Sequence, residues 1–272
     1  MNPSMKRASR GLFFSGCAAH TVEYTLETPA FEPGGGLTVV LISDLHSAVF
    51  AADQEPLVKA ITQAEPDIIL LTGDIFDSRI ARAGAVLLLE RIAGRAPLFY
   101  VTGNHEYRSG DIERIRAALA SFQVRILSDE YVALKLPGGG VIAAGTEDPC
   151  KARYDDSAYN QGAAMERAFR ELDGMRGFKI LAAHRPEYIE LYRRYNFDLV
   201  VSGHTHGGQV RIPGILNGLY APNQGFFPKY AGGLYRLGKT TLIISRGLAV
   251  NPFIPRIYNP PELVVIRIKA GV

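Results

Sequence analysis

The 272-residue chain has only two cysteines and almost no excess of charge of either sign. Cys17 and Cys150 lie far apart in the sequence and in no metal-binding spacing, which excludes a disulfide scaffold. With 30 Lys and Arg against 27 Asp and Glu, the net charge is +3 and no dense basic stripe occurs, so we expect no nucleic-acid partner. A hydrophobic content of 47% excludes disorder for most of the chain. The longest apolar runs are strand-sized, so we expect no helix that spans a bilayer.

The N-terminus carries an ambiguous signal. Lys6, Arg7 and Arg10 precede an apolar stretch over 11–19, an order typical of the charged and hydrophobic regions of a signal peptide. This stretch is short and interrupted by two glycines and a serine, so it also fits a disordered or surface-lying terminus. We expect an N-terminal segment over 1–36, either a vestigial export or membrane-contact signal or such a terminus, followed by one domain over 37–272. The expected location is the cytoplasm or the membrane periphery, with export as the alternative.

Strand-like and helix-like segments alternate through the first half of the chain. The predicted strands lie at 37–42, 68–71 and 98–101, and the predicted helices lie around 57–61, 85–92 and 112–122. This order implies right-handed crossovers and a sheet covered by helices on both faces.

The second half is richer in hairpin patterns. A hairpin is predicted for 131–136 and 141–144, and hairpin strands again for 240–244 and 262–268. Buried strands at 179–183 and 198–201 flank a helix over 186–195 that begins with proline. Together the two halves predict a layered α/β sandwich with two sheets.

Five short polar motifs each follow an apolar strand. Functional groups collect where the strands of such a sheet end, so we expect the five motifs to form one site. Each motif alone is as well explained by a turn or a helix cap. In combination, however, five of the six histidines stand at predicted strand ends. The motifs are Asp44-Leu45-His46, Gly73-Asp74, Gly103-Asn104-His105-Glu106, Ala183-His184 and Gly203-His204-Thr205-His206-Gly207.

The donor atoms of this set indicate metal ions. Two carboxylates, one amide and four imidazoles without a thiolate suit Mn, Fe, Zn or Mg-like ions rather than a closed structural zinc site. Seven ligands are too many for one ion with room for substrate, and they fit two ions about 3.5–4 Å apart that share a carboxylate. The candidate ligands are Asp44, His46, Asp74, Asn104, His184, His204 and His206.

The spacing within the motifs supports this interpretation. Residues two apart on an extended chain point the same way, so Asp44 and His46 are expected to reach one ion together. The same reasoning places His204 and His206 on one side, one for each ion. The neighbouring glycines are expected to let the backbone turn beneath the metals. They are Gly73, Gly103, Gly203, Gly207 and Gly208.

The ordered set DLH, GD, GNHE, a lone histidine after a strand, and GHTHGGQ resembles the calcineurin-like metallophosphoesterase superfamily. The resemblance covers about 37–268 and implies a four-layer αββα sandwich of two mixed sheets flanked by helices, with a binuclear metal centre. By this resemblance one ion is held by Asp44, His46, Asp74 and His206, and the other by Asp74, Asn104, His184 and His204.

Patterns in the C-terminal third are similar to the YaeI/YkuE-like branch of that superfamily. They lie at 207–209, 219–222, 232–235, 245–248, 255–256 and 259–263. The branch implies a phosphodiesterase or a lipid-linked pyrophosphatase, and one relative type hydrolyses UDP-2,3-diacylglucosamine. We therefore expect a metal-activated hydroxide to attack the phosphorus of a phosphodiester or pyrophosphate, with a lipid-linked substrate as the finer expectation. The alternatives are a phosphomonoesterase acting on small molecules or phosphoproteins, and a non-catalytic metal-binding interaction module.

Three further expectations concern the surroundings of the metals. His105, beside Asn104 but outside the ligand pattern, is expected to face the leaving group and donate a proton to it. Arg185 and Arg246 are expected to meet a phosphate, with a solvated arginine as the alternative. Glu106 or backbone carbonyls are expected to orient the imidazoles.

The segment 210–235 is apolar and rich in glycine and proline. It is expected either to contact an acyl chain or a membrane, or to fold onto its own domain. The expected partners are a phosphoester substrate and a peripheral membrane surface, with no obligate protein partner.

Overall fold

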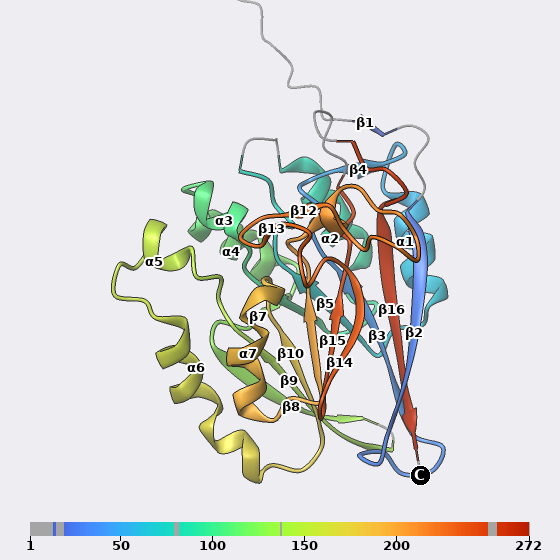
Figure 1. Ribbon diagram of the computed structural model, residues 1–272, viewed down its shortest axis with the longest axis vertical. Coiled ribbons are helices and arrows are strands. Elements are labelled where there is room, and N and C mark those ends of the chain that lie inside the picture. The colour runs from blue at the N-terminus through green and yellow to red at the C-terminus, as the bar shows by residue number, and fades with distance from the viewer. Residues whose placement is uncertain (1–12, 15–18, 79–81, 137, 250–254, 272) are drawn as a thin grey trace, which may run out of the picture.

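The fold is built from two six-stranded mixed sheets that pack face to face, with helices on both outer faces (Figure 1). The structure is a computed structural model that describes residues 13–14, 19–78, 82–136, 138–249 and 255–271.

The first sheet has the order β2-β16-β3-β5-β6-β7. Strands β3, β5, β6 and β7 are parallel, β16 is antiparallel to β3, and β2 is parallel to β16. Its strands are β2 (His20–Thr28), β16 (Glu262–Ala270), β3 (Gly36–Ile42), β5 (Ile68–Thr72), β6 (Leu98–Val101) and β7 (Arg125–Ile126). Its outer face packs against α1 (Glu55–Gln63), α2 (Ala83–Ile92) and α4 (Ile112–Ser121).

The second sheet has the order β14-β15-β11-β10-β9-β8. Its four central strands are parallel and both edge strands are antiparallel. Its strands are β14 (Gly233–Leu237), β15 (Thr240–Ile244), β11 (Leu199–Ser202), β10 (Phe178–Ala182), β9 (Gly139–Gly145) and β8 (Glu130–Leu136). Its outer face is covered by α6 (Gln161–Phe169), η1 (Arg170–Gly174) and the run η2 (Pro186–Tyr188), α7 (Ile189–Tyr192) and η3 (Arg193–Tyr195).

Small elements cap the end of the sandwich at which β3 terminates, the upper end in Figure 1. They include β4 (Val49–Phe50), α3 (Asn104–Arg108), η4 (His206–Gly208), β12 (Tyr220–Ala221) and β13 (Gly225–Phe226). Strand β4 pairs with β1 (Phe13–Phe14), and α5 (Lys151–Tyr154) follows β9.

Alternation along the strands produces the layers. In β3, the side chains of Val39 and Leu41 enter the core between the two sheets, whereas Val40 and Ile42 enter the core between the sheet and its helices. A third core lies between the second sheet and its own helices. Three cores separate four layers, which confirms the expected αββα sandwich.

The structure corrects one predicted pairing and adds a strand. Strand β15 forms its hairpin with β14, so the expected hairpin of 240–244 with 262–268 is wrong, and β16 lies in the first sheet. Buried strands have similar apolar sequences. Which strands pair depends on the path of the chain between them, and the local sequence does not encode that path. Strand β2, which precedes the first predicted strand, was not predicted. It is an edge strand exposed on alternate residues, so its apolar pattern in the sequence is weak.

Within the described ranges, the helices are too short or too polar for any of them to cross a bilayer.

Candidate metal centre

All seven predicted ligands follow strands that end at one edge of the sandwich. Asp44, Asp74 and Asn104 follow the parallel strands β3, β5 and β6 of the first sheet, while His184 and the pair His204 and His206 follow β10 and β11 of the second. Because the two sheets stack with these ends together, residues 160 positions apart meet, as the contact of the His204 amide with Asp44 shows.

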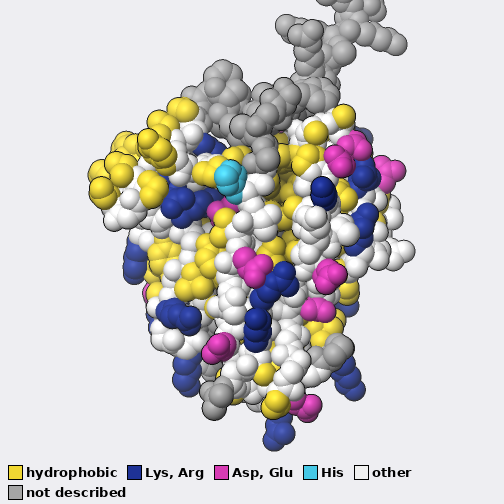
Figure 2. All heavy atoms as spheres, turned by 90° about the vertical axis from the view of Figure 1, so that its right-hand side faces the viewer, with side chains coloured by type: hydrophobic (Ala, Val, Ile, Leu, Met, Phe, Trp, Pro, Cys, Tyr) yellow, Lys and Arg dark blue, Asp and Glu magenta, His cyan; other side chains and the backbone are white. Residues whose placement is uncertain are grey.

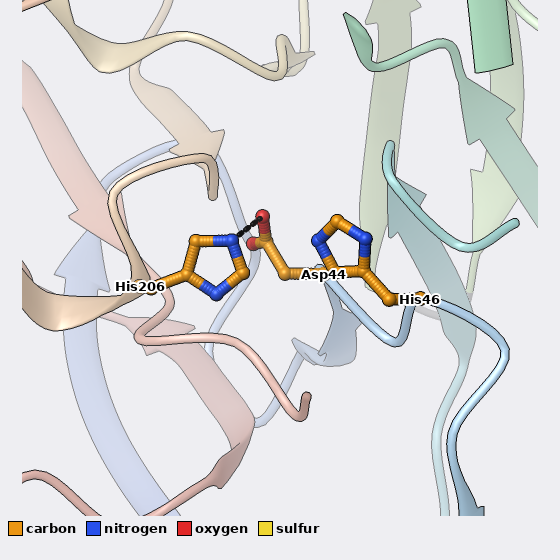
Figure 3. Close-up of side chains that lie close together, drawn as sticks. All are labelled: Asp44, His46 and His206. Carbon is orange, nitrogen blue, oxygen red and sulfur yellow. Dashed lines mark ion pairs between the residues drawn. The ribbon is translucent and has the colours of Figure 1, made fainter. Parts of the chain in front are cut away.

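One group consists of Asp44, His46 and His206, each offering a ligand atom within 4.8 Å of the others. Figure 3 shows these side chains approaching one another from two loops, Asp44 and His46 from the loop after β3 and His206 from the loop after β11. His206 Nε2 lies 3.6 Å from Asp44 Oδ1, and the two imidazoles stack with centroids 5.1 Å apart. Carboxylate oxygens and imidazole nitrogens that lie this close together are typical of residues that bind one cation.

A second group consists of Asp74, His184 and His204, also within 4.8 Å of one another. His184 Nε2 lies 3.3 Å from Asp74 Oδ2 and 3.2 Å from His204 Nδ1. The side-chain amide of Asn104 lies 2.9 Å from His204 Nδ1. In one orientation its nitrogen faces His204, and in the other its carbonyl oxygen faces the group, as a cation would require.

Asp74 stands between the two groups. Its Oδ2 lies 3.7 Å from His46 Nε2 on one side and 3.3 Å from His184 Nε2 on the other. Its Oδ1 accepts a hydrogen bond from the backbone N–H of His105, 2.8 Å away, which fixes the carboxylate in place. One oxygen therefore faces both groups, the position of a bridging ligand.

Hydrogen bonds at the far side of two imidazoles determine which ring nitrogen is free. His46 Nδ1 lies 3.0 Å from Asp77 Oδ2, and His184 Nδ1 lies 2.8 Å from the carbonyl of Thr72. Since both partners are acceptors, each Nδ1 carries a proton, and each Nε2 is the nitrogen that faces the centre and is left to bind a cation. Among the described residues, His46 Nε2 is buried without a hydrogen-bond partner. A buried orphan acceptor is costly, and a cation in this position would satisfy it, so the donor set fits metal binding.

The electrostatics of the metal-free centre are dominated by Asp74 and by burial. Burial acts to lower the pKa of His184, but the adjacent Asp74 carboxylate raises this pKa to about 10. Burial holds the pKa of His206 at about 3 and that of His204 well below its ordinary value. A proton on His184 thus neutralises the carboxylate when no cation does. Because metal and proton compete for this nitrogen, metal affinity must fall at acid pH.

The backbone at the ligands is strained. Asp44, His46, Asp74, His204 and His206 have φ values of 50°, 46°, 51°, 70° and 48°, all in the left-handed region. Each such non-glycine residue costs about 1–3 kcal/mol. The expectation that Asp44 and His46 converge because their chain is extended is therefore wrong. Both side chains reach the same group through tight turns.

Two of the predicted glycines make room for ligands. A Cβ on Gly203 would lie 1.8 Å from Ser43 Oγ and 2.3 Å from Asp44 Oδ2. A Cβ on Gly103 would lie 2.2 Å from Asp74 Oδ1. Only a residue without a side chain lets the neighbouring loops approach this closely.

Glu106 has a different role from the one expected. It is fully buried, and its carboxylate accepts hydrogen bonds from the backbone N–H groups of Asp74, Ile75, Phe76 and Gly103 at 2.8–3.1 Å. It therefore fixes the loop that carries Asp74 rather than an imidazole. The carboxylate that orients an imidazole is Asp77, which no motif singled out.

Asn223, in the turn between β12 and β13, was also not predicted. Its Nδ2 lies 2.9 Å from His204 Nε2 and 3.0 Å from Glu187 Oε1. It thus joins the far side of His204 to a carboxylate. A single asparagine after proline signals only a turn in the sequence, so nothing there pointed to this contact.

His105 lies at the open side of the centre. Its ring packs edge-on against His46 with centroids 4.4 Å apart, and its Nδ1 lies 3.2 Å from Ser78 Oγ and 3.5 Å from Asp77 Oδ2. Its side chain is 26% exposed, more than the other histidines of the centre. The distances also allow it to form a group with His46 and Asp74. Its role as proton donor stays a prediction.

The two predicted phosphate-binding arginines already have protein acceptors. Arg185 is buried and bonds Asp148 through two nitrogens, at 2.6 and 3.0 Å. Arg246 is buried with its Nη2 2.8 Å from Asn217 Oδ1 and its Nε 3.7 Å from Glu262 Oε2. Contact of either arginine with a phosphate stays a prediction.

Sequence comparison places relatives of this chain in several organisms. A Helicobacter pylori protein described as an uncharacterized metallophosphoesterase is 30% identical over 263 residues, which cover 94% of this chain and 66% of that protein. A Bos taurus transmembrane protein with metallophosphoesterase domain is 31% identical, covering 86% and 53%. The Bacillus subtilis metallophosphoesterase YkuE is 25% identical, covering 92% and 85%. This chain thus spans only about half to two thirds of the length of the first two relatives.

Solved structures share the fold. The NAD nucleotidase NadN of Haemophilus influenzae superposes with a TM-score of 0.55 at 14% identity, covering 78% of this chain and 45% of that one. The sulfate thiohydrolase SoxB of Thermus thermophilus gives a TM-score of 0.50 at 14% identity, covering 78% and 52%. At such identity the likeness concerns the fold alone. The family model for calcineurin-like phosphoesterases matches residues 37–208, the span that carries every predicted ligand. The chain belongs to the calcineurin-like phosphoesterase family.

Proposed function

We propose that this chain hydrolyses phosphodiester or pyrophosphate bonds at a centre of two divalent cations. The observation that carries the proposal is the position of Asp74, whose Oδ2 faces His46 on one side and His184 on the other. A carboxylate shared between two ligand groups is typical of two-metal hydrolytic sites. The manganese, zinc or iron that such sites hold all accept this mixture of oxygen and nitrogen donors.

The residues divide between the two cations as the two groups do. The proposed ligands are Asp44, His46, Asp74 and His206 for one cation, and Asp74, Asn104, His184 and His204 for the other. Two such cations supply a nucleophile at neutral pH and neutralise the charge that develops on phosphate oxygens.

The remaining steps belong to the protein. Asp77 and the Thr72 carbonyl hold two imidazoles in the orientation that ligation needs, and Glu106 holds the loop of Asp74. His105, at the open side of the centre, would donate its proton to the oxygen of the leaving group. Help of this kind is worth about 10²–10⁴-fold in rate.

A substrate panel with the manganese-loaded protein tests the proposal. We expect faster hydrolysis of bis-p-nitrophenyl phosphate than of p-nitrophenyl phosphate. The panel also includes UDP-2,3-diacylglucosamine, because the C-terminal patterns resemble the branch that contains hydrolases of this lipid-linked pyrophosphate. A preference for the monoester would make the protein a phosphomonoesterase instead, and bound metal without any hydrolysis would favour an interaction module.

The bridging role of Asp74 needs its own variant. Asp74→Asn is expected to lower manganese content, measured by elemental analysis, and to abolish turnover. Asp53→Asn is the matched control, because Asp53 is exposed and its partners, Arg91 and the N–H of Glu55, lie away from the metal centre. Full metal content in Asp74→Asn would contradict the two-metal assignment.

A further inference from the structure

The exposed large hydrophobic side chains of the described residues are concentrated on one part of the molecule. Seven of the nine belong to two segments of the C-terminal third; the other two are Tyr154 and Tyr188. We call the seven the apolar platform: Ile212, Ile215, Tyr220, Phe226, Phe227, Ile257 and Tyr258. Phe226, Phe227 and Tyr258 are about 70% exposed and Ile215 is 84% exposed. Solvent exposure of so much apolar surface in one region marks an interaction site.

The apolar platform is held together by main-chain hydrogen bonds. In the hairpin of β12 and β13, Tyr220 pairs with Phe226 and their rings meet edge-on with centroids 5.3 Å apart. Phe227 donates its N–H to the carbonyl of Leu219, 2.7 Å away. The second segment joins the first through the N–H of Arg211, which bonds the carbonyl of Ile257 at 3.0 Å. Figure 2 shows hydrophobic side chains crowded on a projection at its upper left, with Lys and Arg side chains directly beneath.

The charged residues in the stretch of chain that carries the apolar platform are all basic. Residues 199–261 contain no Asp or Glu, although 27 acidic residues occur in the chain, and they contain six Lys and Arg. Lys229 is exposed two residues after Phe227, and Arg211 precedes Ile212. Exposed aromatic and aliphatic side chains in a stretch of chain whose charged residues are all basic complement a bilayer with anionic headgroups. A partner protein would need no such exclusion of acidic residues over 63 positions.

The apolar platform also lies beside the metal centre. Its β12 strand packs on η4, where Leu219 donates its N–H to the carbonyl of Gly208 at 3.0 Å, and Asn223 in the same hairpin contacts His204. We propose that the apolar platform docks on the surface of an anionic phospholipid bilayer, so that the metal centre opens at the lipid–water interface. The docking needs no catalysis. That the docked protein would reach a lipid-linked substrate at this interface rests on the proposed function.

Co-sedimentation with vesicles tests the docking directly. The wild-type protein is mixed with vesicles of phosphatidylcholine and phosphatidylglycerol, and with vesicles of phosphatidylcholine alone. We expect binding to the mixed vesicles, and at least about tenfold weaker partitioning for the double variant Phe226→Ser and Phe227→Ser. Tyr154→Ser is the matched control, because Tyr154 is an exposed aromatic residue on α5, outside the apolar platform, and its loss should leave binding unchanged.

A second variant keeps the test decisive if the double variant folds poorly. Lys229→Glu leaves the apolar side chains in place and is expected to weaken binding to mixed vesicles at least about fivefold, with little effect on pure phosphatidylcholine. Thermal melts followed by circular dichroism check the fold of each variant. Asp74→Asn should keep wild-type vesicle binding while losing hydrolysis, so failure of docking and failure of the proposed function are distinguishable.

Three results would overturn the proposal. They are no binding to mixed vesicles, equal binding by wild type and the double variant, and a stable wild-type dimer that the double variant converts to a monomer in light scattering. The last result would assign the apolar platform to a second copy of this chain.

Discussion

Glu106→Gln gives the sharpest test of how the site is held in place. The carboxylate accepts four backbone N–H groups, two at each oxygen, and the amide of glutamine replaces one oxygen by a donor. Two buried N–H groups then lose their acceptor, at about 1–3 kcal/mol each. Part of this loss is offset, because burial and the nearby Asp74 carboxylate raise the pKa of Glu106 to about 7, which shows that the ion is itself costly to bury. We therefore expect the free energy of unfolding to fall by about 2–4 kcal/mol.

Urea unfolding of the metal-free protein measures this change, and a manganese titration measures its effect on the site. Since Glu106 fixes the loop of Asp74, manganese affinity should fall about 10–100-fold. Glu113→Gln is the control, because Glu113 lies on the exposed face of α4 and pairs with Arg116 at the surface. Its effect should stay within about 0.5 kcal/mol. Equal unfolding curves and equal manganese affinity for Glu106→Gln and Glu113→Gln would refute the reasoning.

Three further predictions concern the space at Gly203, the pH dependence of stability at Glu147 and proton donation by His105. Gly203→Ala should destabilise the protein by about 1–3 kcal/mol and weaken manganese binding, because its Cβ would overlap Ser43 Oγ; Gly174→Ala, where the Cβ meets nothing within 4 Å, is the control in the same melts. Burial acts to raise the pKa of Glu147, but the hydroxyls of Ser128, Thr102 and Tyr107 hold it below its ordinary value of 4.5. The ionised Glu147 therefore contributes its full stabilisation above pH 4.5, and this contribution is lost as the pH falls through the pKa of the folded state. The difference in melting temperature between wild type and Glu147→Gln should be large at neutral pH and shrink in acid. A difference that stays constant with pH would contradict this prediction. His105→Ala should lower kcat/KM about 10²–10⁴-fold for a diester with a poor leaving group and far less for bis-p-nitrophenyl phosphate, and equal losses on both would rule out the proton-donor role.

The sequence predicted the central strands and the residues that follow them. Runs such as 37–42 and 68–71 are apolar on both faces, which only a strand between two layers requires, and a polar residue after such a run stands at the sheet edge. The elements with partial exposure were harder to predict. Strand β2 was missed, and β16 was assigned the wrong partner, because pairing between distant strands depends on contacts that a local pattern does not encode.

The identity of the candidate ligands could be predicted from the sequence, but the geometry around them could not. Left-handed φ is commoner for Asp and His than for most non-glycine residues, but this preference is too weak to predict it at Asp44 and His46, where the surrounding loops impose it. The four N–H groups around Glu106 come from two loops about 30 positions apart, and Asn223 reaches His204 from a separate hairpin. Such contacts arise from the packing of the loops, so only the folded chain reveals them.

Each ligand group takes residues from both sheets. Asp44 and Asp74 come from the first sheet, whereas His184, His204 and His206 come from the second. The width of each group is therefore set by how far apart the sheets sit, which depends on the bulk of side chains such as Val101 and Ile243 that fill the space between them. Adding or removing a methyl group between the sheets would therefore change the distances between the ligand atoms at the edge of the sandwich. Residues that never touch the reaction can in this way tune which ion the protein prefers.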